Sequence, residues 1–158
     1  MLPHMQYWLF KTEPSAYSID DLAREGVGRW DGVRNYQARN FLRDHVAAGD
    51  RVFIYHSSTA VPGIAGTGMV VKAGYPDPAA YDPESPYYDP KSSPLHPRWY
   101  AVDVRFDEAF DTVLPLAQLR HEPALARMAL LVPGQRLSIQ PVRAVEWAHI
   151  MKLVTRTV

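Results

Sequence analysis

Residues 30–43 read Trp30-Asp31-Gly32-Val33-Arg34-Asn35-Tyr36-Gln37-Ala38-Arg39-Asn40-Phe41-Leu42-Arg43 and combine an aromatic residue, a turn, polar amides and three arginines. Asp31-Gly32 is a turn pair, and Asn35 is a residue type that commonly caps a helix N-terminus. From Tyr36 onward, apolar residues recur at helical spacing, which predicts a helix whose inward face carries Ala38, Phe41, Leu42 and Val46.

This stretch contains the groups needed to hold a flat, polar ligand. Trp30 and Asn35 flank the start of the expected helix, where unpaired N–H groups and the helix dipole attract negative charge. Arg34, Arg39 and Arg43 are expected to point outward, and the last two are one helical turn apart. A nucleobase with its phosphate fits this set. The alternative is a core tryptophan, a simple cap and solvated arginines, and these residues alone favour neither interpretation.

Further motifs lie on both sides of this stretch and cover almost the whole chain. They are Tyr7–Thr12 followed by Glu13-Pro14, Tyr17–Leu22, Gly49-Asp50 before Val52–Ser57, and Leu137–Val142. Together with residues 30–43 they resemble the EVE domain, a PUA-like family that is similar to the YTH readers of N-methylated adenine in RNA. The family is associated with modified bases, notably 5-methylcytosine and its oxidised forms in DNA. The resemblance implies a base-flipping reader that performs no chemistry on the base.

The resemblance also implies a fold and a site. The fold is a PUA-like mixed, partly closed β-barrel surrounded by short helices. A flipped base needs a stacking partner and hydrogen bonds to its edge, and Trp30 is the expected stacking partner. The expected base-binding pocket consists of Lys11, Thr12, Trp30, Asn35, Tyr36, Gln37, His56, Ser57, Ser138, Gln140 and Pro141, and Arg34, Arg39 and Arg43 are the expected phosphate contacts. Segments near residues 11, 30, 56 and 140 would then converge at the mouth of the barrel.

Length and composition limit the alternatives. A chain of 158 residues is long enough to bury roughly two thirds of its unfolded surface, so a single domain over residues 1–158 is expected. The absence of cysteine excludes thiolate zinc sites and cysteine nucleophiles. Neither a signal peptide nor an apolar run of membrane-spanning length is present in the sequence, which predicts a soluble, cytoplasmic protein.

The charge balance bears on the partner. Seventeen basic and seventeen acidic residues give a formal net charge of zero, whereas indiscriminate binding to nucleic acid usually needs a basic domain. Binding is therefore expected to be local and selective, and the family resemblance implies DNA rather than RNA as the partner. An RNA reader of a modified ribonucleotide stays open as an alternative.

The pattern of strands and helices predicts an α+β fold. Strands are expected over residues 6–11, 51–56, 63–73 and 98–110, and helices over 18–25, from 35 onward, 115–120, 124–131 and 141–154. Glycines at 63, 66 and 68 suggest a bulge or a close backbone approach. Pro141 suits the first position of the last helix, and Trp147 is expected to lie in the core.

Residues 74–97 form a Pro/Tyr-rich loop that holds seven of the fourteen prolines and four tyrosines. So much proline is expected to prevent pairing in a sheet. One interpretation is a long surface excursion; the other is a lid whose tyrosines stack on flanking bases. The small number of cations in the loop favours the first.

An enzyme is the remaining alternative, in the form of a hydrolase that uses His56. However, His56 and Ser57 are adjacent, so in a strand they would point to opposite faces. The sequence contains no deaminase, HExxH or phosphate-loop signature, and the other histidines are scattered singly. We therefore expect no catalytic residue, no cofactor and no metal.

Overall fold

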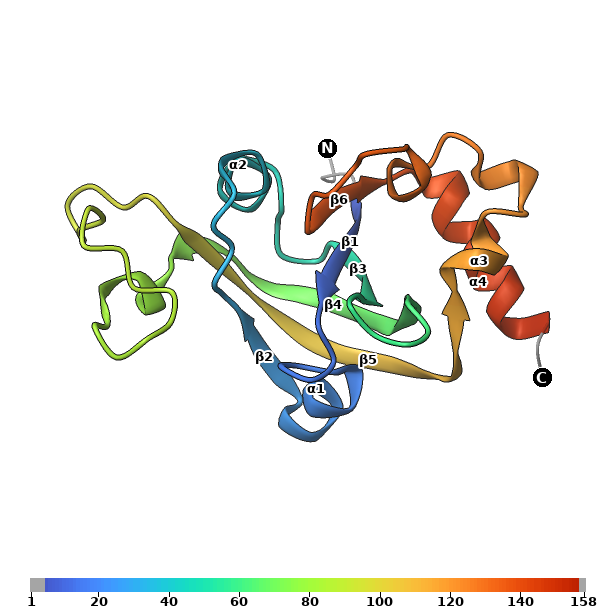
Figure 1. Ribbon diagram of the computed structural model, residues 1–158, viewed down its shortest axis with the longest axis horizontal. Helices are drawn as coiled ribbons and strands as arrows, with labels where there is room; N and C mark the ends of the chain where they lie inside the picture. Colours follow the sequence, from blue (N-terminus) through green and yellow to red (C-terminus); the bar gives the residue numbers. More distant parts are fainter. Residues whose placement is uncertain (1–4, 157–158) are drawn as a thin grey trace.

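The computed structural model describes residues 5–156, which form a mixed α+β fold around one six-stranded sheet (Figure 1). The strands are β1 (Tyr7–Thr12), β2 (Val27–Trp30), β3 (Arg51–His56), β4 (Gly63–Pro76), β5 (Tyr100–Pro115) and β6 (Ile139–Val142). Their order in the sheet is β2-β5-β4-β3-β1-β6, with β1 and β3 parallel and the other neighbours antiparallel. The α+β class is thus confirmed.

The sheet is open, so the predicted partly closed barrel is wrong. Closure requires hydrogen bonds between the two edge strands, and here the edges are β2 and β6, which lie at opposite ends of the strand order. Each edge strand has only four residues and pairs with one neighbour among the strands of residues 5–156. The sheet curves, so that β1 crosses the direction of the long strands β4 and β5 (Figure 1).

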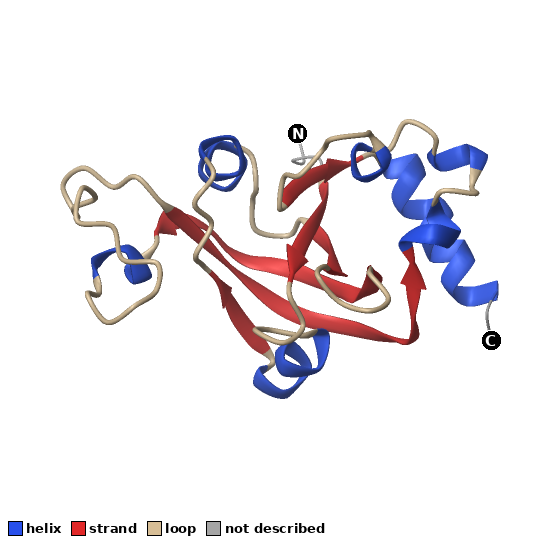
Figure 2. Cartoon of the chain, viewed as in Figure 1, coloured by secondary structure: helices blue, strands red, loops and turns tan. Residues whose placement is uncertain are grey.

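The helices lie around the outside of the sheet (Figure 2). They are α1 (Ile19–Glu25), α2 (Tyr36–Asp44), α3 (Leu116–Leu119) and α4 (Ala144–Arg156), together with 3-10 helices at Pro78–Tyr81, Pro123–Leu125 and Ala129–Leu131. The predicted helix over residues 124–131 is therefore two short 3-10 helices, because extended backbone at Met128 interrupts it. Pro141 lies in β6 and not at a helix start, which corrects a second boundary.

Capping residues fix where α1 and α2 begin, as the sequence predicts. The Ser18 side chain accepts a hydrogen bond from the Asp21 backbone N–H, and the Asp21 carboxylate accepts one from the Ser18 N–H, which is a complete capping box. The Asn35 Oδ1 atom accepts from the Ala38 N–H at 3.0 Å. The cap at Asn35 therefore sets the start of α2 beside the Asp31-Gly32 turn.

Alternating side chains of β1 serve two hydrophobic clusters, one on each face of the sheet. Trp8 and Phe10 belong to a cluster that includes buried residues of α1 and α2, whereas Leu9 belongs to the cluster that includes α4. In the second cluster Trp147 stacks on Phe53 with 3.8 Å between ring centroids, so the prediction that Trp147 is a core residue is confirmed. Burial of both faces holds β1 rigidly in the middle of the molecule.

The long strands β4 and β5 carry the proline-rich loop at one end (Figure 1). The register of this pair shifts at several points, and an added Cβ at Gly66 would lie 2.2 Å from the Glu108 carbonyl oxygen, which confirms the expected close approach. Pro76 pairs with Tyr100, so the prediction that this segment stays outside the sheet is wrong at its start. The pairing of β3 with β4 ends at Met69, which leaves Pro76 on a free edge where its missing N–H costs little.

Candidate functional site

A cleft of about 530 Å³ lies where β1 and β2 end. Its walls are made by Lys11, Thr12, Glu13, Ala16, Tyr17, Arg29, Trp30, Asp31, Gly32, Val33, Arg34, Tyr87 and Ser138. This volume is in the range of sites for small molecules and single ligand groups, roughly 300 to 1,000 Å³. The cleft therefore has room for one nucleobase.

Backbone hydrogen bonds bring distant segments to the cleft. The Lys11 N–H donates to the Ser138 carbonyl oxygen at 2.8 Å, and the Ser57 N–H donates to the Thr12 carbonyl oxygen at 2.9 Å. The end of β1 is thus fixed between β3 and the segment that leads into β6. Trp30, at the end of β2, is held by its pairing with Val102 of β5.

The structure gathers part of the predicted site at this cleft. Lys11, Thr12, Trp30, Ser138 and Arg34 line it. The other predicted pocket residues and phosphate contacts are not among its lining residues; these are Asn35, Tyr36, Gln37, His56, Ser57, Gln140, Pro141, Arg39 and Arg43. Of the four segments expected to converge, those near residues 11 and 30 and the one entering β6 meet here.

Trp30 is both a core residue and a wall of the cleft. Its side chain is only 7% exposed, and its ring centroid lies 5.6 Å from that of Phe10 and 5.9 Å from that of Tyr17. The Tyr17 ring meets it edge to face. A ligand in the cleft can therefore reach only a small part of Trp30, and Tyr17 supplies further aromatic surface.

Lys11 lines the cleft, but its amine is directed toward Tyr55 of the second hydrophobic cluster, on the side of β1 that also carries Leu9. Its side chain is half-buried, and burial lowers the pKa of its amine. The Nζ atom lies 5.6 Å from the centroid of the Tyr55 ring, and within residues 5–156 Lys11 forms no ion pair. By contrast, Arg29 in the same cleft is paired with Asp31 at 3.1 Å.

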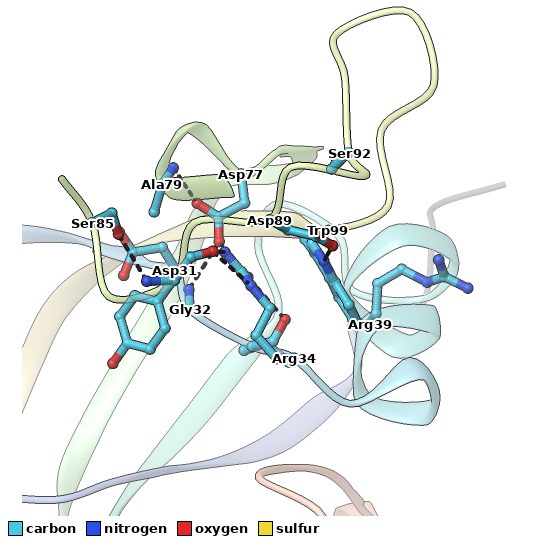
Figure 3. Close-up of polar contacts among 12 residues, drawn as sticks. Asp31, Gly32, Arg34, Arg39, Asp77, Ala79, Ser85, Asp89, Ser92 and Trp99 are labelled. Atoms are coloured by element: carbon cyan, nitrogen blue, oxygen red, sulfur yellow. Dashed lines mark hydrogen bonds and ion pairs between the residues drawn. The ribbon is translucent and has the colours of Figure 1, made fainter. Parts of the chain in front are cut away.

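Arg34 is held by groups of the proline-rich loop (Figure 3). Its Nη1 atom lies 2.9 Å from the Asp77 carboxylate, which is fully buried, whereas the Arg34 side chain is 22% exposed. Its Nε and Nη2 atoms donate to the Tyr87 carbonyl oxygen at 3.2 and 2.7 Å. The same Asp77 oxygen accepts from the Gly32 N–H at 2.9 Å. This guanidinium therefore ties the loop to the turn after β2.

The remaining residues predicted on α2 lie beside the cleft. The Tyr36 side chain is 52% exposed and stacks on Trp99, with 4.9 Å between centroids and 28° between planes. The Arg39 guanidinium lies 4.8 Å from the Tyr36 centroid and donates to the Arg98 carbonyl oxygen. Arg43 is paired with Asp44, while Gln37 is exposed and Asn35 serves as the cap.

His56, Ser57 and the residues of β6 do not line the cleft but hold the segments next to it in place. The His56 Nε2 atom accepts a hydrogen bond from the Ile19 N–H at 3.1 Å, so the ring fixes the start of α1. Burial lowers the pKa of His56, an effect partly opposed by the charge of Asp20. The Gln140 Nε2 atom donates to the Leu137 carbonyl oxygen, which steadies the segment next to Ser138. Ser57 contacts the Thr12 carbonyl oxygen, and Pro141 pairs with Trp8.

Several lining residues were missed by the sequence reasoning. They are Glu13, Ala16, Tyr17, Arg29, Asp31, Gly32, Val33 and Tyr87. Most of them adjoin the motifs, so extending each motif by a few residues finds them. Tyr87 has no such signal, because its loop reaches the cleft through the long-range contact between Asp77 and Arg34.

Two wider features of the described chain also bear on the site. No helix within residues 5–156 is long and apolar enough to cross a membrane. Over the same residues, no group of three or more potential metal ligands comes together. The functional groups at the cleft are aromatic rings, the cationic side chains of Lys11, Arg29 and Arg34, the carboxylates of Glu13 and Asp31, hydroxyls and backbone groups.

Comparison with known proteins places this architecture among relatives. The family described as "EVE domain" matches residues 6–153. Human thymocyte nuclear protein 1 is 39% identical over 93% of this chain and 73% of its own length. A crystal structure of a Pseudomonas syringae protein is 51% identical, with a TM-score of 0.90 over 94% of this chain and 99% of that one.

A second solved structure shows a ligand. This structure is of human thymocyte nuclear protein 1 in complex with DNA containing 5-methylcytosine. The protein is 39% identical, with a TM-score of 0.87 over 94% of this chain and 97% of that one. The names of these relatives denote no catalytic activity. They do correct the predicted cytoplasmic location, because relatives from human and zebrafish are named as nuclear proteins. Composition alone does not separate the nucleus from the cytoplasm.

Proposed function

We propose, on the premise that this chain belongs to the EVE domain family, that it binds nucleic acid and accepts one extruded base in the cleft. The favoured ligand is a modified cytosine such as 5-methylcytosine in DNA. The protein performs no chemistry on that base. The observation that carries this proposal is the complex of the human relative with DNA containing 5-methylcytosine, which superimposes with a TM-score of 0.87.

The composition of the cleft supports the same ligand. Aromatic side chains, Tyr17 and Trp30 among them, offer apolar surface to a flat base and to a methyl group on it. Lys11 lines the cleft and forms no ion pair among the described residues, so its long side chain is free to turn from Tyr55 toward a phosphate oxygen of the ligand. Thr12 and Ser138 line the same cleft and supply hydroxyl-bearing side chains to its wall.

The other predicted contacts take a second role in this proposal. Tyr36 and Gln37 are exposed and Arg39 is partly exposed on α2, which begins just after the cleft residue Arg34, and in this proposal they meet the strand that carries the extruded base. Asn35 caps that helix. Arg34 and Arg43 each have a carboxylate partner already, so their contribution to phosphate binding is smaller.

A hydrolase that uses His56 is disfavoured by the arrangement of the ring. A general base must have a nitrogen lone pair within reach of the proton it removes. The Nε2 lone pair of His56 is occupied by the Ile19 N–H, and the ring is not among the residues that line the cleft. His56→Gln should therefore lower stability without abolishing any reaction.

Titration of fluorescent duplexes tests the proposed function. Four matched oligonucleotides, DNA and RNA with cytosine or 5-methylcytosine at one position, are compared by anisotropy. The expected result is tightest binding to the modified DNA, and weaker binding by Lys11→Gln than by the exposed control Lys91→Gln. Equal affinity for all four duplexes would refute base reading. Preference for the modified RNA would shift the assignment to the ribonucleotide reader, since the 2′-OH is the distinguishing group.

A further inference from the structure

Tyr87 brings the proline-rich loop to the wall of the cleft. It lines the cleft together with Trp30 and Gly32, although more than fifty residues separate it from them in sequence. Its ring packs directly on the turn after β2, because an added Cβ at Gly32 would lie 2.7 Å from ring atoms of Tyr87. The side chain is nevertheless 42% exposed. One part of the ring is thus fixed by contact, and another part is free.

The position of Tyr87 is fixed by hydrogen bonds to Arg34, which is itself anchored to a buried carboxylate. Its carbonyl oxygen accepts two hydrogen bonds from the Arg34 guanidinium, which in turn pairs with the buried Asp77 carboxylate (Figure 3). Asp77 also accepts from the N–H groups of Gly32 and Ala79. These contacts join the beginning and the middle of the loop to the turn. The ring is therefore held in place before any ligand binds, which reduces the entropy lost on binding.

The contacts of the ring leave it without an internal polar role. Within the described residues, no hydrogen bond involves the Tyr87 hydroxyl, and the Arg34 guanidinium lies 5.5 Å from the ring centroid. A partly exposed aromatic ring at the mouth of a cleft offers the kind of surface on which bases stack regardless of sequence. The neighbouring Tyr88 is equally exposed, at 43%, but does not line the cleft.

We infer that Tyr87 is a further ligand-contacting residue, which stacks on the nucleobase held in the cleft. This inference rests on the proposed function and extends it, because it assigns the proline-rich loop as a wall of the base-binding site. Asp77 and Arg34 are positioning residues that act through the backbone of Tyr87. The loop is in this respect more than a surface excursion.

The test compares Tyr87→Ala with Tyr88→Ala, a matched control from the same loop with the same exposure. Binding to a DNA duplex carrying one 5-methylcytosine is measured by anisotropy, and folding by thermal denaturation. Loss of one stacking contact should weaken binding by Tyr87→Ala roughly 5- to 150-fold, which corresponds to about 1–3 kcal/mol. Tyr88→Ala should bind like the parent. Tyr87→Phe should also bind like the parent, because it keeps the ring and loses an unpartnered hydroxyl.

Tyr87→Leu covers the case in which the alanine variant is unstable. Leucine keeps apolar bulk against Gly32 but lacks a flat ring, so this folded variant should lose affinity as well. Parent-like binding by both Tyr87→Leu and Tyr87→Ala would overturn the inference and leave the proposed function standing. Absence of binding by the parent protein itself would overturn the proposed function, and this inference with it.

Discussion

Replacing Gly32 with alanine tests whether the absence of a side chain at this turn allows the Tyr87 ring to lie against it. Gly32 has a φ of +75°, and Gly49, which lies just before β3 begins, has a φ of +95°. Alanine in the left-handed region costs roughly 1–2 kcal/mol at either position. The two sites differ in their surroundings, because an added Cβ at Gly49 meets nothing within 4 Å, whereas at Gly32 it meets the Tyr87 ring at 2.7 Å.

The contact at Gly32 decides what moves. A separation below 3.0 Å requires displacement, and the atoms concerned belong to the outer end of the partly exposed Tyr87 side chain. The ring should therefore swing away from the cleft while the backbone stays in place. Both alanine variants should lose similar stability, and each 1 kcal/mol should lower the Tm by roughly 2–4 °C for a chain of this size. Gly32→Ala alone should lose affinity for modified DNA.

Differential scanning fluorimetry and anisotropy on the two variants provide the assay. The double variant Gly32→Ala with Tyr87→Ala completes a thermodynamic cycle, in which the loss of affinity should be less than the sum of the single losses. Additive losses would refute the idea that Gly32 acts through Tyr87. So would an equal loss of affinity in Gly49→Ala.

Three further predictions concern the remaining polar groups. Asp77→Ala should lower the free energy of unfolding by about 2–4 kcal/mol in urea titration, because it removes a buried acceptor from several donors. A loss below about 0.5 kcal/mol is the range of an ordinary surface substitution. Such a small loss would show that the loop is not anchored at Asp77. Burial lowers the pKa of His56, so the unfolded chain takes up this proton more readily, and stability should fall as the pH drops below about 6.5. His56→Gln should flatten this decline and the exposed His121→Gln should not, as measured by denaturation between pH 5 and about 7.5; identical curves would contradict the argument. Lys11 and Arg39 are the cations near the cleft that have no carboxylate partner among the described residues. The slope of log affinity for DNA against log salt concentration should therefore be roughly −2. A slope near −8 would place the interface elsewhere.

Local chemistry was readable from the sequence. The caps at Ser18 and Asn35 follow from side chains that accept bonds from N–H groups three residues later. The inward face of α2 follows from helical spacing, and Ala38 and Leu42 are indeed fully buried. Trp147 was assigned to the core on the same ground. Each of these features depends on neighbours within one or two helical turns.

Long-range pairing was not readable in the same way. Nothing in the sequence pattern couples Asp77 to Arg34, so the sequence favoured a surface excursion over a lid whose tyrosines contact bases. His56 was taken for a pocket group, but its acceptor nitrogen bonds the Ile19 N–H across 37 positions. Pro141 was given to a helix because it suits a first turn, yet pairing with Trp8 in the sheet prevailed. In each case tertiary contacts outweighed a local preference.

The placement of β1 has a consequence for how the chain matures during synthesis. This strand lies between β3 and β6, and its residues pair with Arg51–His56 on one side and with Ile139–Val142 on the other. A nascent chain that has not yet emerged past residue 142 leaves one side of β1 without a partner and lacks the Ser138 carbonyl that holds Lys11. Because synthesis proceeds at about 5–20 residues per second, β1 waits several seconds after its own emergence for β6 to emerge. During that interval the exposed strand edge is open to pairing with other chains, and the cleft becomes able to hold a ligand only when β6 has paired with β1.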